Sequence, residues 1–184
     1  MCIEWRPFVL LLAACVTLPL FAEVERPVDV RVEPLLANYK WGQLKSRWDE
    51  GLDCFNRFTP GNTYCGCAAT AVGMVMHYNR WPAVSLPPIE QAYCTYEGTG
   101  VTYRVEGGAF DWDRMPEDAT EIAVQDEADA IGRLTFDIAA ASSSCFATNT
   151  SEWRTSDEIR RGEIKETVTF VQNVYWQLKK RYGY

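Results

Sequence analysis

The strongest hydrophobic pattern in the chain begins at Cys67. Apolar side chains cover most of a helical circumference rather than one stripe, because they stand at positions 68, 69, 71, 72, 74, 75 and 76. A helix with this pattern is typical of a protein core. Proline disfavours helix at the residue before it, so Trp81-Pro82 ends the pattern. These positions predict a buried helix that starts at Cys67.

Two patterns after Pro82 predict a hairpin and a second helix. Residues 83–108 lack a helical period, and β-branched or aromatic residues flank Gly98-Thr99-Gly100, which predicts a hairpin around these three residues. Apolar residues spaced by three and four predict an amphipathic helix from about residue 120 to residue 141, with an apolar face of Val124, Ala128, Ile131, Leu134 and Ile138.

The C-terminal region predicts a loop and a final helix. Ser142-Ser143-Ser144 is the predicted loop. Thr155 and Glu158 match a capping box, and apolar residues recur from 159 to 178, which predicts a helix that ends towards Gly183. The β-branched residues at 167–170 leave the start of this helix open.

Composition and charge narrow the classes of function. With 184 residues, 47% of them hydrophobic, the chain suits one folded domain and is not disordered. The net charge of -7 disfavours binding to nucleic acid or to an anionic membrane, since Lys179-Lys180-Arg181 is the single basic cluster. That cluster is expected to complement the C-terminal end of a helix.

The N-terminus predicts export. Residues 8–22 are apolar but too few for a membrane span, and Leu20-Phe21-Ala22 precedes Glu23, so residues 1–22 are predicted to be a signal peptide and 23–31 a polar lead-in. A lipoprotein cleavage box ending at Cys15 is the alternative. In both cases the protein is exported, either secreted or periplasmic.

Export changes what the cysteines imply. Five of the seven remain after residue 22, and an odd number in an oxidising compartment predicts up to two disulfide bridges and one free thiol. If Cys67 is the free thiol, three pairings stay open among Cys54, Cys65, Cys94 and Cys145. Their spacing does not match a zinc knuckle, and Cys65 and Cys67 stand too close together for a Cys-x-x-Cys redox pair. No metal or cofactor is therefore expected.

Cys67 is the candidate for nucleophilic chemistry. Gly66 permits a sharp turn that leaves the thiol at the N-terminus of the predicted helix, where unpaired N–H groups favour a thiolate. The alternative is a small buried hydrophobe or half of a disulfide. Asp111 and Asp113 are not a second candidate site, since two carboxylates this close to Pro116 are expected to cap or turn the chain.

Four ordered blocks carry a family resemblance. Cys65-Gly66-Cys67-Ala68-Ala69-Thr70-Ala71, with Met76-His77-Tyr78 and Trp81-Pro82, resembles the nucleophile region of the streptopain family of cysteine peptidases, whose pattern is Gly-Cys-x-Ala-Thr-Ala. The other three blocks agree in order over residues 32–141, and they are Val32-Glu33-Pro34-Leu35-Leu36 with Trp41-Gly42-Gln43, then Phe110-Asp111-Trp112-Asp113-Arg114-Met115-Pro116, then Ala130-Ile131-Gly132-Arg133-Leu134 with Asp137-Ile138.

The resemblance implies a fold and two site residues. The implied fold is α+β and papain-like, represented mainly by its helical half with a central Cys-bearing helix and a short β-hairpin, so residues 32–184 are expected to be a partial peptidase domain. Cys67 is the implied nucleophile. Gln43 is the implied oxyanion donor, because a glutamine amide offers two N–H donors. The implied substrates are proteins or peptides.

The chain lacks a histidine suited to this chemistry. His77 is its single histidine. On one helix His77 lies about 15 Å from Cys67, whereas a hydrogen bond needs about 3 Å; we expect instead a favourable contact of His77 with the helix dipole. In the family the catalytic histidine lies in a later, β-rich half.

Two functions from different classes follow. The first is an exported cysteine-type endopeptidase, incomplete or inactive as this chain alone, which needs a C-terminal half from elsewhere and is marginally stable or self-associates without it. The second is a secreted non-catalytic binding or remnant domain in which the cysteines are structural.

Overall fold

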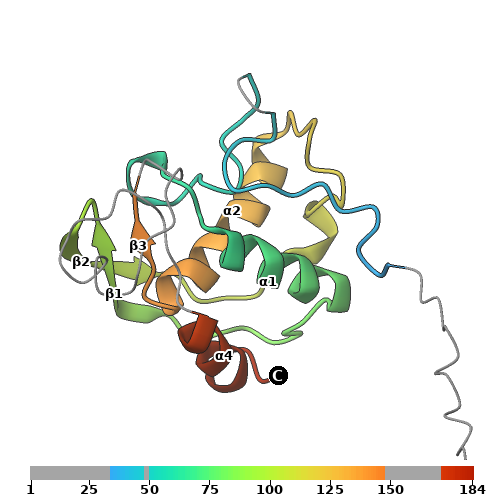
Figure 1. Cartoon of the computed structure of the whole chain (residues 1–184). Helices are drawn as coiled ribbons and strands as arrows, with labels where there is room; N and C mark the ends of the chain where they lie inside the picture. Colours follow the sequence, from blue (N-terminus) through green and yellow to red (C-terminus); the bar gives the residue numbers. More distant parts are fainter. Residues whose placement is uncertain (1–33, 48–49, 148–170) are drawn as a thin grey trace, which may run out of the picture. The chain divides into compact units, whose positions relative to one another are not determined.

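A computed structural model of the chain describes residues 34–47, 50–147 and 171–184 (Figure 1). The predicted signal peptide, the lead-in and the capping box at Thr155 lie outside the described residues. Within these residues, three helices and three strands run in the order α1 (Cys67–Asn79), β1 (Ile89–Tyr96), β2 (Thr99–Val105), α2 (Gln125–Ala141), β3 (Cys145–Phe146) and α4 (Val171–Lys180), with 3-10 turns η1 (Pro60–Asn62) and η2 (Trp112–Arg114).

Helix α1 has the predicted boundaries and packs against α2 (Figure 1). Gly73 makes room for the Trp41 ring, because a Cβ atom there would lie only 3.2 Å from that ring, whereas its distances of 3.7 Å to Leu134 and Ile138 of α2 would be ordinary van der Waals contacts. The prediction that α1 is buried on all sides is wrong for one face. Cys67, Ala71, Val75 and Tyr78 recur along that face and are exposed, which leaves an apolar stripe on the surface.

Helix α2 forms the centre of the core. Four of the five residues predicted for its apolar face, Ala128, Ile131, Leu134 and Ile138, are fully buried. The fifth, Val124, is 54% exposed, because the helix starts later than predicted and Val124 is its N-cap residue. Residues 120 and 121, which the periodicity placed in the helix, form a turn instead.

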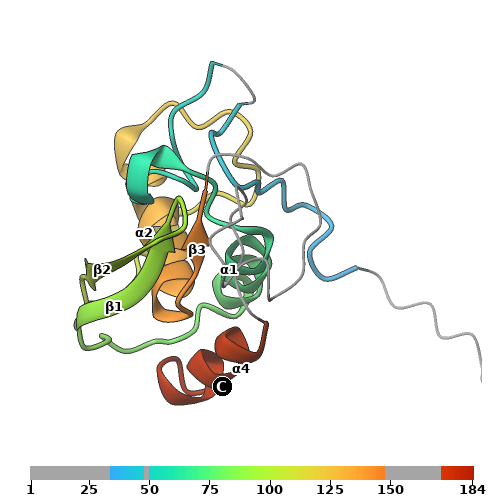
Figure 2. The same cartoon turned by 60° about the vertical axis from the view of Figure 1, so that its left-hand side comes forward.

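The sheet has the strand order β2-β1-β3 and lies against α2, as Figure 2 shows. Strands β1 and β2 form the predicted hairpin, with Tyr96 opposite Thr99. Its turn is Glu97-Gly98, so the predicted turn around Gly98-Thr99-Gly100 was placed too far along the chain. Both turn residues have positive φ angles of 46° and 79°, as the tight hairpin turn that matches strand twist requires.

Strand β3 was not predicted. It pairs in parallel with β1, Thr95 with Cys145 and Tyr96 with Phe146, directly after the serine loop. Two residues are too short for a periodic signal, and β3 exists only because β1 offers it an edge.

A buried ion pair fixes α4 and the C-terminus to the core. Arg181 donates to both carboxylate oxygens of Asp137 at 2.8 and 2.7 Å, and the Tyr182 hydroxyl donates to the same carboxylate at 2.6 Å. The Trp81 indole N–H donates to the carbonyl of Tyr182 at 2.6 Å. Arg181 therefore forms this buried ion pair. The sequence predicted that it would complement the C-terminal end of a helix together with Lys179-Lys180.

The predicted disulfide bridges are wrong in this structure. All five cysteines that follow residue 22 are free thiols. Cys54, Cys65, Cys94 and Cys145 are buried and occupy core positions as small apolar groups, whereas Cys67 is exposed. No helix among the described residues is long and apolar enough to cross a membrane.

Candidate active site

The candidate active site begins at the turn into α1. Gly66 has φ 93° and ψ 143°, a conformation that a side chain would strain, and α1 starts at the next residue. The Cys67 side chain is exposed at this end of the helix. The first backbone N–H groups of a helix have no partners within it, and in α1 these groups lie at the same helix end as the thiol.

Replacing Gly66 by alanine tests this turn. A residue held in a sparsely populated region of φ and ψ is destabilised by about 1–3 kcal/mol. We expect Gly66→Ala to lower the free energy of unfolding by that amount, measured by urea denaturation, and to slow alkylation of Cys67. Gly108→Ala is the control for a positive φ, because a Cβ atom there meets nothing within 4 Å and lies outside the α1 turn. Equal alkylation rates in Gly66→Ala and the parent protein would show that the turn does not position the thiol.

Backbone hydrogen bonds hold the segment that contains Gln43 against this turn. The backbone N–H of Cys65 donates to the carbonyl of Gln43 at 3.1 Å. The hydroxyl of Thr70, one turn into α1, donates to the carbonyl of Gly42 at 2.7 Å. The Gln43 backbone is therefore fixed from both sides of Cys67.

Cys67 and Gln43 line the same cleft, which has a volume of about 310 Å³. Trp41 and Tyr64 are further parts of the wall, and among the described residues that line the cleft Lys45 has the one basic side chain. The structure thus brings together the two residues that the sequence analysis selected, although 24 positions separate them.

Trp41 and Thr70 support the cleft and were not selected as functional residues from the sequence. The Trp41 indole N–H donates to the carbonyl of Pro116 at 2.9 Å, and its ring packs on Phe55 with centroids 5.8 Å apart. Trp41 and Thr70 stand in two of the resemblance blocks, Trp41-Gly42-Gln43 and Ala69-Thr70-Ala71. Their hydrogen bonds join distant parts of the chain, so the sequence did not indicate their supporting role.

Cys67 and its neighbour Cys65 differ in solvent exposure. The Cys65 thiol is completely buried and lies 3.4 Å from the Thr70 hydroxyl. Desolvation raises the pKa of Cys65 to about 12, so this thiol stays protonated near neutral pH. Burial likewise raises the pKa of Cys94 to about 12 and raises that of Cys54. Among the five described cysteines, only Cys67 is accessible to a substrate.

Comparison with known proteins agrees with this geometry. The sequence profile of the Peptidase C10 family matches residues 48–183. The chain belongs to the Peptidase C10 family. This confirms the family predicted from the sequence, the streptopain family. The matched residues include Cys67, while Gln43 precedes them.

The relatives of this C10 chain are bacterial proteases. It is 25% identical over 132 residues to the thiol protease/hemagglutinin PrtT of Porphyromonas gingivalis, a match that covers 68% of this chain and 15% of PrtT. Active interpain A cysteine protease of Prevotella intermedia has the same fold, with a TM-score of 0.58, 19% identity, and coverage of 80% of this chain and 54% of interpain A.

A fragment of prointerpain A from Prevotella intermedia also shares the fold. Its TM-score is 0.53 at 17% identity, and the match covers 80% of this chain and 42% of the fragment. These neighbours confirm the predicted α+β, papain-like fold. The C10 chain spans about half the length of the solved structures and a smaller share of PrtT.

His77 forms hydrogen bonds with residues that do not line the cleft. Its Nε2 lies 3.2 Å from the carbonyl of Trp112, which can only accept, so Nε2 carries the proton and Nδ1 accepts from the Tyr39 hydroxyl at 2.6 Å. This confirms that His77 is not the partner of Cys67. Desolvation lowers the pKa of His77 below its ordinary value of 6.5. His77 lies in the last turn of α1, as the sequence predicted, and its lowered pKa favours the neutral ring there.

The neutral His77 predicts a pH dependence of stability. Its pKa is lower in the folded chain than in the unfolded one, so its contribution is complete above about pH 6.5 and is lost as the pH falls from there towards the folded pKa. We expect the free energy of unfolding to decrease between pH 7 and pH 5. His77→Gln is the matched variant, since a glutamine amide can accept from Tyr39 and donate to Trp112 without titrating. The same decrease in His77→Gln would contradict this assignment.

The carboxylates near η2 form ion pairs rather than a catalytic pair. Asp111 pairs with Arg114 at 3.0 Å, and Asp113 pairs with Arg80 at 2.5 Å. Asp111 occupies the N-cap position of η2, where its side chain forms no capping hydrogen bond. The expectation that these residues cap or turn the chain is met by the 3-10 turn η2, without a side-chain cap. Within the described ranges, no group of three or more metal-binding side chains is arranged to hold an ion.

Proposed function

We propose that this chain is the nucleophile-bearing part of an exported cysteine-type endopeptidase. One observation carries the proposal, namely that the exposed thiol of Cys67 and the amide of Gln43 line the same cleft at the start of α1. Membership of the Peptidase C10 family supports the same chemistry. The substrates proposed are proteins or peptides, and export rests on the predicted signal peptide over residues 1–22, with anchoring at Cys15 as the alternative.

Cys67 and Gln43 each have a role in the proposed reaction. The thiolate of Cys67 attacks the carbonyl carbon of the peptide bond, and the carbonyl oxygen becomes negatively charged. The side-chain N–H groups of Gln43 and the free N–H groups at the start of α1 donate to that oxygen. The C–N bond then breaks and the amine takes a proton, which leaves an acyl group on Cys67 that water hydrolyses.

The proton for the leaving amine needs a group that this chain does not provide. A histidine usually supplies it in thiol peptidases. The one histidine in the 184 residues, His77, is bonded to Tyr39 and Trp112. We therefore propose that the acid–base histidine comes from further residues of a longer polypeptide or from a second chain.

The exposed stripe of α1 supports the proposal that the histidine lies in another part of the polypeptide or in a second chain. It begins at Cys67 and continues through Ala71, Val75 and Tyr78, with Val75 44% and Tyr78 46% exposed. Apolar surface of this kind beside a catalytic thiol suits coverage by another part of a protein. We propose that the histidine-bearing part covers the stripe, and that the isolated chain is marginally stable or self-associates without it.

An activated ester tests the nucleophile without the missing histidine. In a peptide p-nitrophenyl ester the leaving group departs as nitrophenolate, so no acid is needed. We expect a single acyl adduct on Cys67, measured by intact mass, and an acylation rate about 10- to 100-fold lower in Gln43→Ala, because one oxyanion donor is lost. Gln91→Ala, an exposed glutamine on β1, is the control and should acylate at the parent rate.

The same experiment separates the two functions. Absence of an adduct on Cys67 would contradict the peptidase and favour the non-catalytic domain with structural cysteines. Equal rates in Gln43→Ala and Gln91→Ala would leave Cys67 as nucleophile but remove Gln43 from the oxyanion site.

A further inference from the structure

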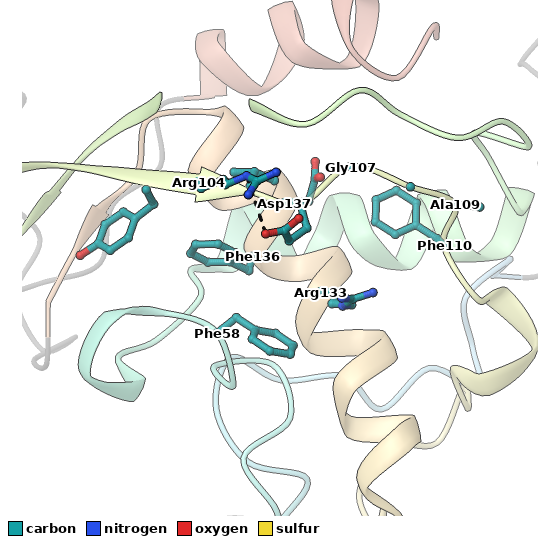
Figure 3. Close-up of a pocket in the computed structure, with 12 residues that line it drawn as sticks. Phe58, Arg104, Gly107, Ala109, Phe110, Arg133, Phe136 and Asp137 are labelled. Atoms are coloured by element: carbon teal, nitrogen blue, oxygen red, sulfur yellow. Dashed lines mark ion pairs between the residues drawn. The ribbon is translucent and has the colours of Figure 1, made fainter. Parts of the chain in front are cut away.

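A second hollow, called here the α2 hollow, lies beside the face of α2 that carries Arg133 and Phe136 (Figure 3). It has a volume of about 300 Å³ and is enclosed by α2, the end of β2, the segment 106–110 and Phe58. This volume is at the lower end of the range for small-ligand sites, about 300–1,000 Å³. The α2 hollow shares no lining residue with the cleft of Cys67 and Gln43, and the proposed hydrolysis does not use it.

Aromatic rings form the walls of the α2 hollow. Figure 3 shows the rings of Phe58, Phe110 and Phe136 grouped around α2. Phe58 is 40% exposed, so its ring is accessible from solvent at the edge of the hollow. Phe136 is held edge-on by Tyr103, with ring centroids 6.1 Å apart, so this wall is fixed before any ligand arrives. The walls suit an apolar or aromatic group.

Arg133 forms no ion pair with another described residue, although Asp129 and Asp137 stand one helical turn away from it on α2. It projects from α2 between Phe58 and Phe110 (Figure 3) and also lines an adjoining, more polar hollow. In the described part of the chain, every other charged residue along the two hollows is ion-paired: Arg104 with Glu106, Asp137 with Arg181, Asp129 with Arg57, and Arg114 with Asp111 and Asp126. Arg133 has no such pair, although the chain as a whole is acidic.

We propose that the α2 hollow binds the C-terminal residue of a peptide, with an apolar or aromatic side chain against the phenylalanine rings and the free carboxylate paired with Arg133. A guanidinium matches a carboxylate with two parallel hydrogen bonds, and the Arg133 side chain is exposed and therefore accessible to a ligand. An internal peptide segment lacks the carboxylate and leaves Arg133 unpaired. The inference goes beyond the proposed peptidase chemistry and does not depend on it.

N-acetyl-L-phenylalanine is the probe for this site, and its amide is the matched ligand without the charge. Binding is measured by calorimetry in the full chain carrying Cys67→Ser, so that no hydrolysis or acylation contributes. We expect a Kd on the order of 1 mM for the acid and about tenfold weaker binding of the amide. Arg133→Gln should weaken binding of the acid about tenfold and leave binding of the amide unchanged. Arg47→Gln is the control, because Arg47 is an exposed arginine that lines neither hollow.

The outcomes that overturn the inference are distinct. Equal affinity for the acid and the amide would remove the role of the carboxylate. An unchanged affinity in Arg133→Gln would place the ligand elsewhere, including in the cleft of Cys67. Inorganic phosphate that binds at Arg133 as tightly as the acid would show a general anion site with no use of the aromatic walls. Arg133→Lys keeps the charge without the two-pronged geometry and should give intermediate affinity, which guards against a variant that fails to fold.

Discussion

Replacement of Cys67 by serine is expected to remove the fast-reacting thiol of the native protein. In a background with Cys2→Ser and Cys15→Ser, the parent chain should show one cysteine that reacts with iodoacetamide at least about 100-fold faster than the other four. The four are buried, and a buried thiol reacts only when the structure opens locally or globally. Cys67→Ser should retain only the slow phase, followed by mass spectrometry.

Cys65→Ser is the matched control for that experiment. Cys65 stands two positions before Cys67, yet its thiol is fully buried against Thr70. Cys65→Ser should keep the fast phase. Loss of the fast phase in Cys65→Ser, or its persistence in Cys67→Ser, would contradict the assignment of Cys67 as the accessible nucleophile.

We expect Asp137→Ala to lower the free energy of unfolding more than removal of any other charged side chain in the described part of the chain. The side chains of Asp137 and Arg181 are 4% and 6% exposed. Removal of Asp137 leaves the buried Tyr182 hydroxyl without its acceptor and the buried guanidinium of Arg181 with only the Pro87 carbonyl, and breaking a buried pair in this way costs about 3–5 kcal/mol. The measurement is urea denaturation of the whole chain, and the expected result is a midpoint shift with little change in slope.

Asp113→Ala provides the comparison for Asp137→Ala. Asp113 also pairs with an arginine, Arg80, but its side chain is 82% exposed. Exposed pairs contribute about 0–1 kcal/mol, so Asp113→Ala should be close to the parent protein. Similar losses in the two variants would mean that the ion pair of Asp137 and Arg181 does not fix the C-terminus to the core.

The sequence predicted the elements whose boundaries depend on local chemistry. Helix α1 begins at Cys67 because Gly66 adopts a backbone conformation reserved for glycine, and it ends close to a proline. The buried face of α2 followed from its periodicity, since a helix that packs on one side has to repeat its apolar residues.

The features that the sequence did not predict depend on contacts between distant residues. Strand β3 has two residues and forms only against β1. The exposure of the α1 stripe depends on what packs on α1, which a pattern of apolar residues does not reveal. The bond between His77 and Tyr39 joins positions 38 apart, so the spacing argument excluded His77 as a catalytic partner without showing what holds it.

The candidate site was predictable in composition but not in geometry. Cys67 stood out through its position at a helix start, a local signal. Gln43 was selected through the resemblance alone, because an oxyanion donor has to be near the nucleophile in space and not in sequence. The backbone bonds from Cys65 to Gln43 and from Thr70 to Gly42 then explain how the fold brings the two residues together.

The central claim is that Cys67 reacts as the nucleophile of a peptide-binding cleft. Its most direct test is labelling of the chain with an epoxysuccinyl peptide, a thiol-peptidase inhibitor, followed by peptide mapping. We predict one adduct, on Cys67, with a rate that saturates as the inhibitor concentration rises, because the peptide part binds in the cleft before the thiolate opens the epoxide. Adducts spread over several cysteines, or a rate on Cys67 that rises linearly without saturation, would contradict the claim.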